Sequence, residues 1–167
     1  MKIAIYPGSF DPVTLGHLDI IQRASSMFDK VIVLVLQNMN KSTFFSKDER
    51  KNLLKEATVN IKNVEIDFFS GLLVNYLKEK NIKFVLKGLR NTIDFNYEFN
   101  MDIANKTMYN DFETIFLFSK IENMHISSSS LKEIAFLGGD ISSFVPECVR
   151  EYIKSKLINK GGIAHDS

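Results

Sequence analysis

Several apolar runs of this chain are followed by residue types that could hold phosphate oxygens. Ammonium, guanidinium and imidazole groups, hydroxyls and the backbone N–H groups of glycine-containing turns are the donors that such anions need. If the fold brings these segments to one edge, they predict a phosphate site. The segments are "PGSFDPVTLGH" with His17, "QNMNKS" with Lys41, "SGLL", "KGLR" with Lys87 and Arg90, and "SKIENMHISSSSLK" with Lys132.

The first of these segments fits neither the dinucleotide fingerprint GxGxxG nor the P-loop pattern GxxxxGK[ST]. Gly8 permits a close backbone approach, and Gly16 precedes His17 where a helix should begin. The N–H groups and dipole there favour an anion and disfavour a protonated imidazole, so a neutral His17 could donate a ring N–H to a phosphate. Alternatively the glycines and prolines only turn the chain and His17 only caps the helix; the spacing does not decide.

Other polar residues also allow two interpretations. Lys132 is expected in the first turn of a helix, where its charge opposes the dipole, so either an anion binds there or the lysine is solvated beside Glu133. Lys87 ends an apolar strand and must reach solvent or meet an anion. Glu98 could accept hydrogen bonds from a ligand or pair with a cation such as Arg90. Lys41 could be a solvated loop lysine, and His125 either a ligand contact or a loop filler.

The elements that would position these residues are apolar strands alternating with amphipathic helices. The apolar runs are nearly continuous, as in strands buried on both faces of a parallel sheet. The alternation predicts an α/β fold, a doubly wound, five-stranded, Rossmann-like parallel sheet whose ligand lies beyond the carboxyl ends of the strands. The expected strands are 2–6, 30–36, 63–69, 82–88 and 113–119, and the expected helices lie in 17–28, 46–58, 71–80, 93–110, 127–139 and 145–157.

Three local signals support the expected helix ends. Ser46 and Glu49 form a capping-box pattern, Gly138 and Gly139 a C-cap, and Pro146 suits a first helical position. The aromatic helix carries Phe95, Phe99 and Ile103 at i, i+4 and i+8, a pattern of core or subunit contact and not of a cofactor site.

Composition limits the function classes. The 167 residues suit one domain, expected at 1–160 with a flexible tail at 161–167. A net charge of +1 argues against nucleic-acid binding by bulk charge. The single Cys148 excludes an intrachain disulfide and suits a cytoplasmic setting. No signal peptide or membrane span is expected, and three histidines without a carboxylate–histidine motif predict no metal site built from protein side chains.

The quoted motifs resemble a known family. "GSFDPVTLGH" and "ISSSSLK" are similar to the T/HxGH and ISSTxxR/K signatures of the nucleotidyltransferase superfamily. "YPGSFDP", "KGLR" and "DFNYEFNM" narrow the resemblance to the phosphopantetheine adenylyltransferases of bacterial coenzyme A biosynthesis, over residues 2–158. That resemblance implies transfer of AMP from ATP to 4′-phosphopantetheine, which gives dephospho-coenzyme A and pyrophosphate. It also implies Mg²⁺ with ATP and a homohexamer.

The resemblance also implies roles for individual residues. His17 would stabilise the transition state and Lys41 would contact the transferred or accepting phosphate. Leu73 would line the pantetheine channel, and Lys87 would meet the substrate phosphate. Ser9 would contact nucleotide or substrate. ATP would be held by Ser9, Phe10, His17, Gly88, Leu89, Arg90, Glu98, Asn123, Met124, His125, Ile126, Ser127, Ser128 and Ser129.

The chain departs from the family pattern at three places. Ser9 stands where threonine is frequent, and it keeps the hydroxyl. Lys87 stands where arginine is usual, which replaces a bidentate fork by a point charge. "NMH" at 123–125 stands where a segment containing an aromatic residue is common.

The nucleophile in such a transfer needs no general base, since a phosphate monoester with a second pKa of about 6 is already largely ionised at neutral pH. Catalysis is then expected from positioning and charge stabilisation. Two other functions stay open: adenylyl transfer to a different phosphate-bearing acceptor, such as nicotinamide mononucleotide or glycerol phosphate, and nucleotide binding without turnover.

Overall fold

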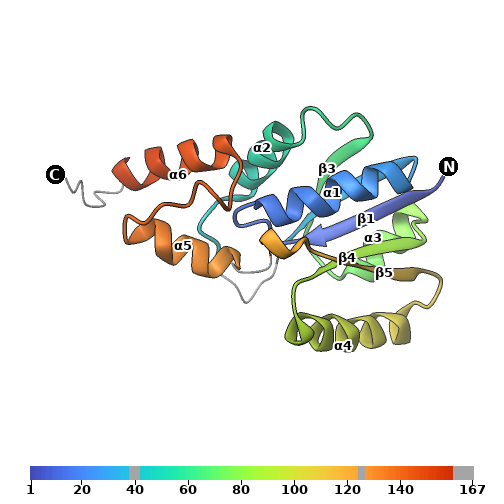
Figure 1. Cartoon of the computed structure of the whole chain (residues 1–167). Coiled ribbons are helices and arrows are strands. Elements are labelled where there is room, and N and C mark those ends of the chain that lie inside the picture. Colours follow the sequence, from blue (N-terminus) through green and yellow to red (C-terminus); the bar gives the residue numbers. More distant parts are fainter. Residues whose placement is uncertain (38–41, 124–126, 160–167) are drawn as a thin grey trace.

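A computed structural model describes residues 1–37, 42–123 and 127–159 of the chain. Its centre is a five-stranded sheet in the order β3-β2-β1-β4-β5, with every neighbouring pair parallel (Figure 1). The strands are β1 (Ile3–Gly8), β2 (Lys30–Leu36), β3 (Val64–Phe69), β4 (Phe84–Leu89) and β5 (Glu113–Phe118). The expected α/β fold with five parallel strands is confirmed.

The connecting helices begin and end close to the expected positions. They are α1 (Leu15–Met27), α2 (Lys47–Ala57), α3 (Leu73–Lys80), α4 (Thr92–Met108), α5 (Ser128–Phe136) and α6 (Glu147–Asn159), with a 3₁₀ turn η1 (Ile121–Asn123) after β5. The capping box of Ser46 and Glu49 is present. Gly138 follows α5 with φ +80, as a left-handed helix end requires. Helix α6 begins one residue after Pro146, whose carbonyl accepts its first hydrogen bonds.

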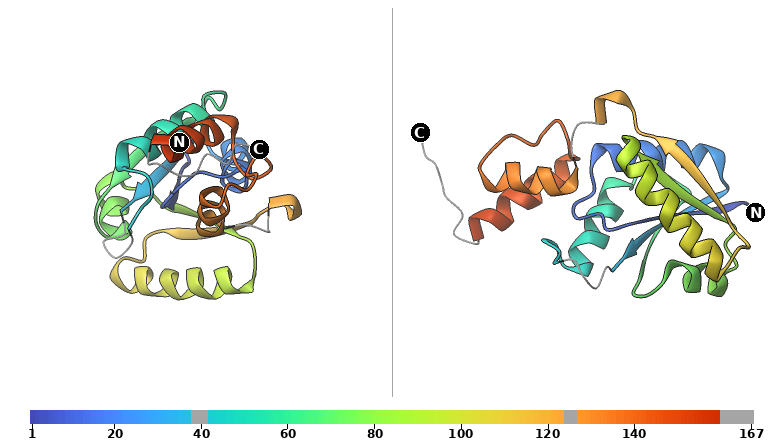
Figure 2. Two further views of the ribbon diagram at one scale, coloured as in Figure 1. Left: turned by 90° about the vertical axis from the view of Figure 1, so that its left-hand side faces the viewer. Right: turned by 90° about the horizontal axis from the view of Figure 1, so that it is seen from below.

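The alternation of side chains along each strand produces two cores, one on each face of the sheet. On one face Tyr6, Val33 and Leu86 pack against residues of α1, α2, α5 and α6. On the other face Ile5, Leu34 and Val85 pack against α3. Helix α4 covers β4 and β5 on the α3 side, as Figure 2 shows. Burial of β1, β2 and β4 explains their nearly continuous apolar sequences, whereas the edge strands β3 and β5 are only partly buried.

The carboxyl ends of the strands point toward α5 and α6, which extend beyond that edge of the sheet (Figure 1). The connections after β1, β2, β4 and β5 therefore meet there, as expected for an open parallel sheet. No helix among residues 1–37, 42–123 and 127–159 has the length and apolar character to cross a membrane.

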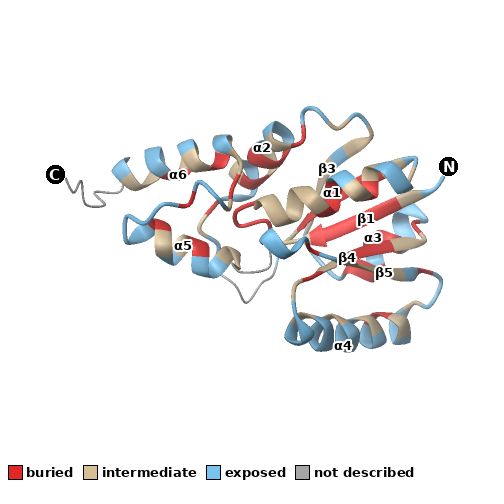
Figure 3. Cartoon of the chain, viewed as in Figure 1, coloured by how far each residue is buried: buried red, intermediate tan, exposed pale blue. Residues whose placement is uncertain are grey.

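The apolar stripe of helix α4 is exposed in the single chain. Its stripe residues Phe95, Phe99 and Ile103 are 41%, 48% and 51% exposed. They are therefore not core residues of the single chain, and most of this helix is drawn as exposed in Figure 3. The core interpretation of the stripe is therefore wrong for the single chain, and a contact between subunits stays a prediction.

Candidate active site

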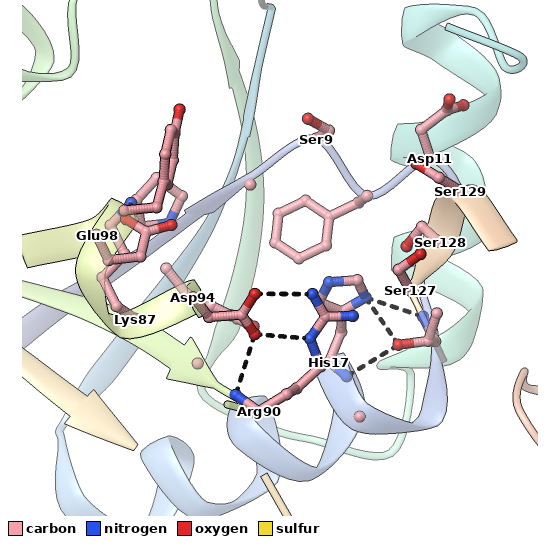
Figure 4. Close-up of a pocket in the computed structure, with 18 of the residues that line it drawn as sticks. Ser9, Asp11, His17, Lys87, Arg90, Asp94, Glu98, Ser127, Ser128 and Ser129 are labelled. Carbon is pink, nitrogen blue, oxygen red and sulfur yellow. Dashed lines mark hydrogen bonds and ion pairs between the residues drawn. The ribbon is translucent and has the colours of Figure 1, made fainter. Parts of the chain in front are cut away.

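A cavity of about 790 Å³ lies at the carboxyl edge of the sheet. Its wall includes segments from the ends of β1 and β4, from the connection after β2, from α4 and from the beginning of α5. In Figure 4, Lys87 and Glu98 lie on one side, Asp11 and Ser127 to Ser129 on the other, and His17 and Arg90 between them. The edge expected to gather cations and hydroxyls is therefore a hollow lined by them.

The His17 imidazole is fixed by the cap of its own helix. Thr14 is the N-cap of α1, and its backbone N–H donates to His17 Nδ1 at 3.1 Å. The Thr14 hydroxyl lies 3.0 Å from the same nitrogen and accepts from the His17 N–H at 3.3 Å. Because Nδ1 accepts from a backbone N–H, the ring proton of the neutral imidazole is on Nε2. His17 thus caps the helix and lines the cavity at once, so the two interpretations of its position are compatible.

The surroundings keep this imidazole neutral. Burial first, and then the positive charge of Arg90, lower the pKa of His17 to about 4. At neutral pH the ring is therefore a neutral donor through Nε2. A neutral N–H can stabilise charge that develops on a phosphate oxygen, and it adds no repulsion toward the nearby guanidinium.

Phe10 supports the histidine from the side. It has φ +47, in the left-handed region that a phenylalanine seldom adopts. This conformation turns its ring to lie edge-on to His17 at 5.0 Å and to Tyr6 at 5.5 Å between centroids. A Cβ on Gly8 would come within 3.0 Å of the same ring, so glycine is needed there for close packing. Phe10 is only 2% exposed and acts as a packed wall of the cavity.

Two ion pairs join β4 to α4 at the cavity. Lys87 Nζ lies 2.7 Å from Glu98 Oε2, with about a fifth of each side chain exposed. Arg90 donates to both carboxylate oxygens of Asp94, at 2.9 and 3.1 Å, and its backbone N–H also donates to Asp94 at 3.1 Å. Glu98 therefore pairs with Lys87, whereas Arg90 is oriented by Asp94, a residue that the motifs did not indicate.

Lys132 is neither a solvated lysine beside Glu133 nor a first-turn residue. It is the fifth residue of α5, and its ammonium donates to Asp11 at 2.7 Å. Asp11 is 5% exposed and also accepts from the backbone N–H groups of Phe44 and Phe45, at 3.0 and 2.8 Å. The opposition between the lysine charge and the helix dipole is thus balanced by a buried carboxylate of the chain itself.

Helix α5 begins at the cavity with a cluster of hydroxyls. Ser127 is its N-cap and accepts from the Ser130 N–H at 3.1 Å. Ser128 donates to the carbonyl of Pro12 at 3.2 Å, which ties the helix to the loop after β1. Ser127, Ser128 and Ser129, whose presence the capping of α5 alone could explain, also line the cavity.

The structure brings most of the predicted site residues to this cavity. Leu73 and Leu89 are not among the described residues that line it, and they are 7% and 1% exposed. Asn123 ends η1. Lys41, Met124, His125 and Ile126 lie outside the described residues. The predicted residues at the cavity are Ser9, Phe10, His17, Lys87, Gly88, Arg90, Glu98, Ser127, Ser128, Ser129 and Lys132.

Sequence reasoning missed several lining residues. Thr14 could have been found, because it precedes His17 by three residues as a capping residue precedes its partner. Asp11 lacked such a signal, since its partners are 33 to 121 residues away. The other residues of the cavity that were not assigned to the site are Tyr6, Pro7, Gly8, Gly16, Ser42, Thr43, Ile93, Asp94 and Tyr97.

Known proteins resemble this chain over most of its length. The cytidylyltransferase-like family matches residues 5–134. The phosphopantetheine adenylyltransferase of Clostridium beijerinckii is 52% identical over 94% of this chain and 99% of its own length. That of Caldanaerobacter subterraneus is 53% identical over 94% of this chain and 98% of its own length.

A solved structure supports the fold. A putative nicotinate-nucleotide adenylyltransferase from Vibrio parahaemolyticus superposes with a TM-score of 0.71 over 92% of this chain and 99% of its own. Its sequence identity is 20%, so the likeness concerns the fold alone.

Proposed function

The chain belongs to the phosphopantetheine adenylyltransferases of the cytidylyltransferase-like family, and we propose on that premise that it transfers AMP from ATP to 4′-phosphopantetheine. The products are dephospho-coenzyme A and pyrophosphate, so the enzyme is a nucleotidyltransferase of coenzyme A biosynthesis. The observation that carries the proposal is the neutral, capped imidazole of His17 at the wall of a cavity that also holds Lys87, Arg90 and Lys132.

The reaction is an in-line displacement at the α-phosphorus of ATP. An oxygen of the acceptor phosphate forms the new P–O bond, and the bond from the α-phosphorus to the oxygen that bridges to the β-phosphate breaks, so pyrophosphate leaves with both bonding electrons. The acceptor phosphate is largely dianionic at neutral pH and needs no general base. The enzyme contributes alignment and charge stabilisation.

We assign a role in alignment or charge stabilisation to several described side chains of the cavity. His17 donates Nε2–H to an oxygen of the transferred phosphoryl group as charge develops. Lys87 meets the acceptor phosphate, and Arg90, oriented by Asp94, meets the nucleotide phosphates. Glu98 contributes a carboxylate acceptor for ATP, and Ser127 to Ser129 present hydroxyls at the start of α5. The remaining assignments, Lys41 to the phosphates, Leu73 to the pantetheine arm and 123–126 to adenine, stay predictions.

We expect Mg²⁺ as the cofactor, bound mainly to ATP. Among the described residues no group of three or more His, Cys, Asp or Glu side chains could hold a metal ion. The three carboxylates at the cavity, Asp11, Asp94 and Glu98, already pair with Lys132, Arg90 and Lys87. The triphosphate oxygens are therefore the ligands that fit Mg²⁺, which would neutralise phosphate charge there.

The family resemblance also leads us to propose a homohexamer that works in the cytoplasm. The exposed apolar face of α4, which includes Phe95, Phe99 and Ile103, supports assembly through this helix. Exposed apolar patches can mark contact sites between proteins.

Pyrophosphate release with ATP and 4′-phosphopantetheine, together with mass detection of dephospho-coenzyme A, tests the function. Pantetheine without its phosphate is the matched control and should give no product. Nicotinate mononucleotide, nicotinamide mononucleotide and glycerol phosphate test the second candidate, another acceptor. ATP binding without pyrophosphate release under any acceptor would instead indicate a nucleotide-binding module.

A further inference from the structure

Asp11 joins three segments that come from distant parts of the chain. It follows β1, its Oδ1 accepts from the Phe45 N–H and its Oδ2 from the Phe44 N–H and from Lys132 Nζ, at 2.8, 3.0 and 2.7 Å. Phe44 and Phe45 belong to the connection after β2, whose neighbours Ser42 and Thr43 line the cavity. Lys132 belongs to α5. One carboxylate thus holds together two contributors to the cavity wall that are far apart in the sequence.

The surroundings of Asp11 suit a charged carboxylate. Asp11 is 5% exposed, and a carboxylate in such a place is costly unless its charge is balanced and its oxygens accept hydrogen bonds. Two backbone donors and one ammonium meet both requirements. The buried Arg50 adds a parallel connection, because its guanidinium donates to the carbonyl of Ser9 at 2.9 Å and to that of Ser46 at 3.4 Å.

We propose that Asp11 is a positioning residue for adenylyl transfer, one that sets residues 42–45 of the connection after β2 and the Lys132 ammonium side by side at one wall of the cavity. The proposal rests on the proposed function. Asp11 acts through its partners: the Phe44 and Phe45 amides place Ser42 and Thr43, and the ion pair prevents the Lys132 ammonium from moving away from the wall. Such alignment matters because a misplacement of about 1 Å can cost roughly 100-fold in rate.

Asp11→Asn is the direct test, since asparagine keeps the shape but has one oxygen acceptor and one NH₂ donor. In either orientation of the amide, its NH₂ group faces at least one of the three donors, which are the Phe44 N–H, the Phe45 N–H and the Lys132 ammonium. At least one of the hydrogen bonds to residue 11 must therefore break. We expect kcat/KM to fall roughly 100-fold, with a rise in KM for at least one substrate. A smaller folded fraction alone would lower kcat and leave both KM values unchanged.

Asp67→Asn is the matched control. Asp67 lies on β3 and accepts from the Phe68 N–H at 2.7 Å and from the Tyr76 hydroxyl at 2.6 Å, away from the cavity lining. The same substitution there should cost stability while KM stays at the wild-type value. Amide hydrogen exchange supplies a readout that does not need turnover: Phe44 and Phe45 should lose protection in Asp11→Asn and keep it in Asp67→Asn.

Lys132→Met separates the two parts of the proposal and serves if Asp11→Asn folds poorly. It should lower kcat/KM while the Phe44 and Phe45 amides stay protected. The double variant Asp11→Asn/Lys132→Met should lose less than the product of the two single losses, because the single changes break one shared ion pair.

Wild-type KM values and unchanged amide protection in Asp11→Asn would overturn the positioning role. Independent, multiplicative losses in the double variant would overturn the coupling between Asp11 and Lys132. Absence of pyrophosphate release from the wild-type enzyme would instead refute the proposed function, and the amide-exchange result would still decide whether Asp11 holds the connection after β2.

Discussion

At the scale of the residue, His17 shows how a local cap can orient a group to which we assign a catalytic role. Thr14 occupies Nδ1, and so the ring proton is fixed on Nε2 before any substrate binds. His17→Ala should lower kcat by about 100-fold or more, since single donors to a developing charge are worth that much. The Kd for ATP, measured by titration calorimetry, should change much less. Equal losses in kcat and ATP affinity would contradict a role specific to the transition state.

The depressed pKa of His17 has a measurable consequence for stability. Its value of about 4 lies below the ordinary 6.5, so between these two pH values the unfolded chain binds a proton that the native chain does not. The free energy of unfolding should therefore fall as pH is lowered from 6.5 toward 4. Urea denaturation of the wild type and of His17→Gln should show this contribution in the wild type alone.

An NMR titration of the His17 ring gives an independent check of the same shift. Chemical shifts that report a midpoint near 4 would agree with a buried neutral ring, whereas a midpoint at or above 6.5 would contradict the role of a neutral donor.

Lys87 is, with Ser9, one of two cavity residues where the chain departs from the family pattern. Lys87→Arg should retain or lower the KM for 4′-phosphopantetheine, because guanidinium binds phosphate through two parallel hydrogen bonds and can still pair with Glu98. Steady-state kinetics with varied acceptor measure this. Lys83→Arg, just before β4 at its opposite end and paired with Asp111, is a control that should have no effect. A large rise in KM for Lys87→Arg would show that the site is tuned to lysine.

At the scale of the element, α6 is attached to α2 through one carboxylate. Glu49 belongs to the capping box of α2, and it also accepts from Tyr152 and Lys156 of α6 at 2.6 Å each. Burial raises the pKa of Glu49, but the hydrogen bonds from Lys156, Tyr152 and Ser46 outweigh this effect and lower it to about 2. The charged form of Glu49 is thus part of the contact between the two helices.

Glu49→Gln should destabilise the fold by about 1 to 3 kcal/mol at neutral pH, because the charged hydrogen bonds to α6 are lost. A depressed carboxyl pKa stabilises the native state above the ordinary value of 4.5, and this contribution is lost as pH falls toward 2. Urea unfolding curves should therefore differ between wild type and variant at pH 7 and converge at low pH. A constant difference across this range would show that the effect is not electrostatic.

The same residue shows what the sequence could predict about the elements and what it could not. The spacing of Ser46 and Glu49 indicated a helix start, because a capping box is local. The pairing of Glu49 with α6 spans more than 100 residues, as does that of Asp11 with Lys132, and no local pattern records it. Strand positions were predictable because burial on both faces leaves a continuous apolar run. The cavity edge followed from the parallel sheet, while its ion pairs depend on tertiary packing.

At the scale of the whole molecule, the exposed face of α4 determines how the chain should assemble. Phe99→Glu would place a charge between Phe95 and Ile103, which lie on the same face of α4 and are 41% and 51% exposed. Burying that charge in a subunit contact is costly, so we expect a lower mass by light scattering with unchanged circular dichroism. Val59→Glu, at an exposed turn after α2, should leave the mass unchanged. An unaltered mass for Phe99→Glu would exclude this face from the contact.

The position of β1 in the middle of the sheet has a consequence for the order of events during synthesis. β1 pairs with β2 from residue 30 onward, but its other neighbour is β4, where Ala4 pairs with Phe84. The first loop of the cavity is therefore made early, whereas α5, which packs against that loop, is synthesised only after some 130 residues. ATP cannot stabilise the nascent chain through this site until that helix has docked, so folding must reach the last third of the sequence without help from the ligand.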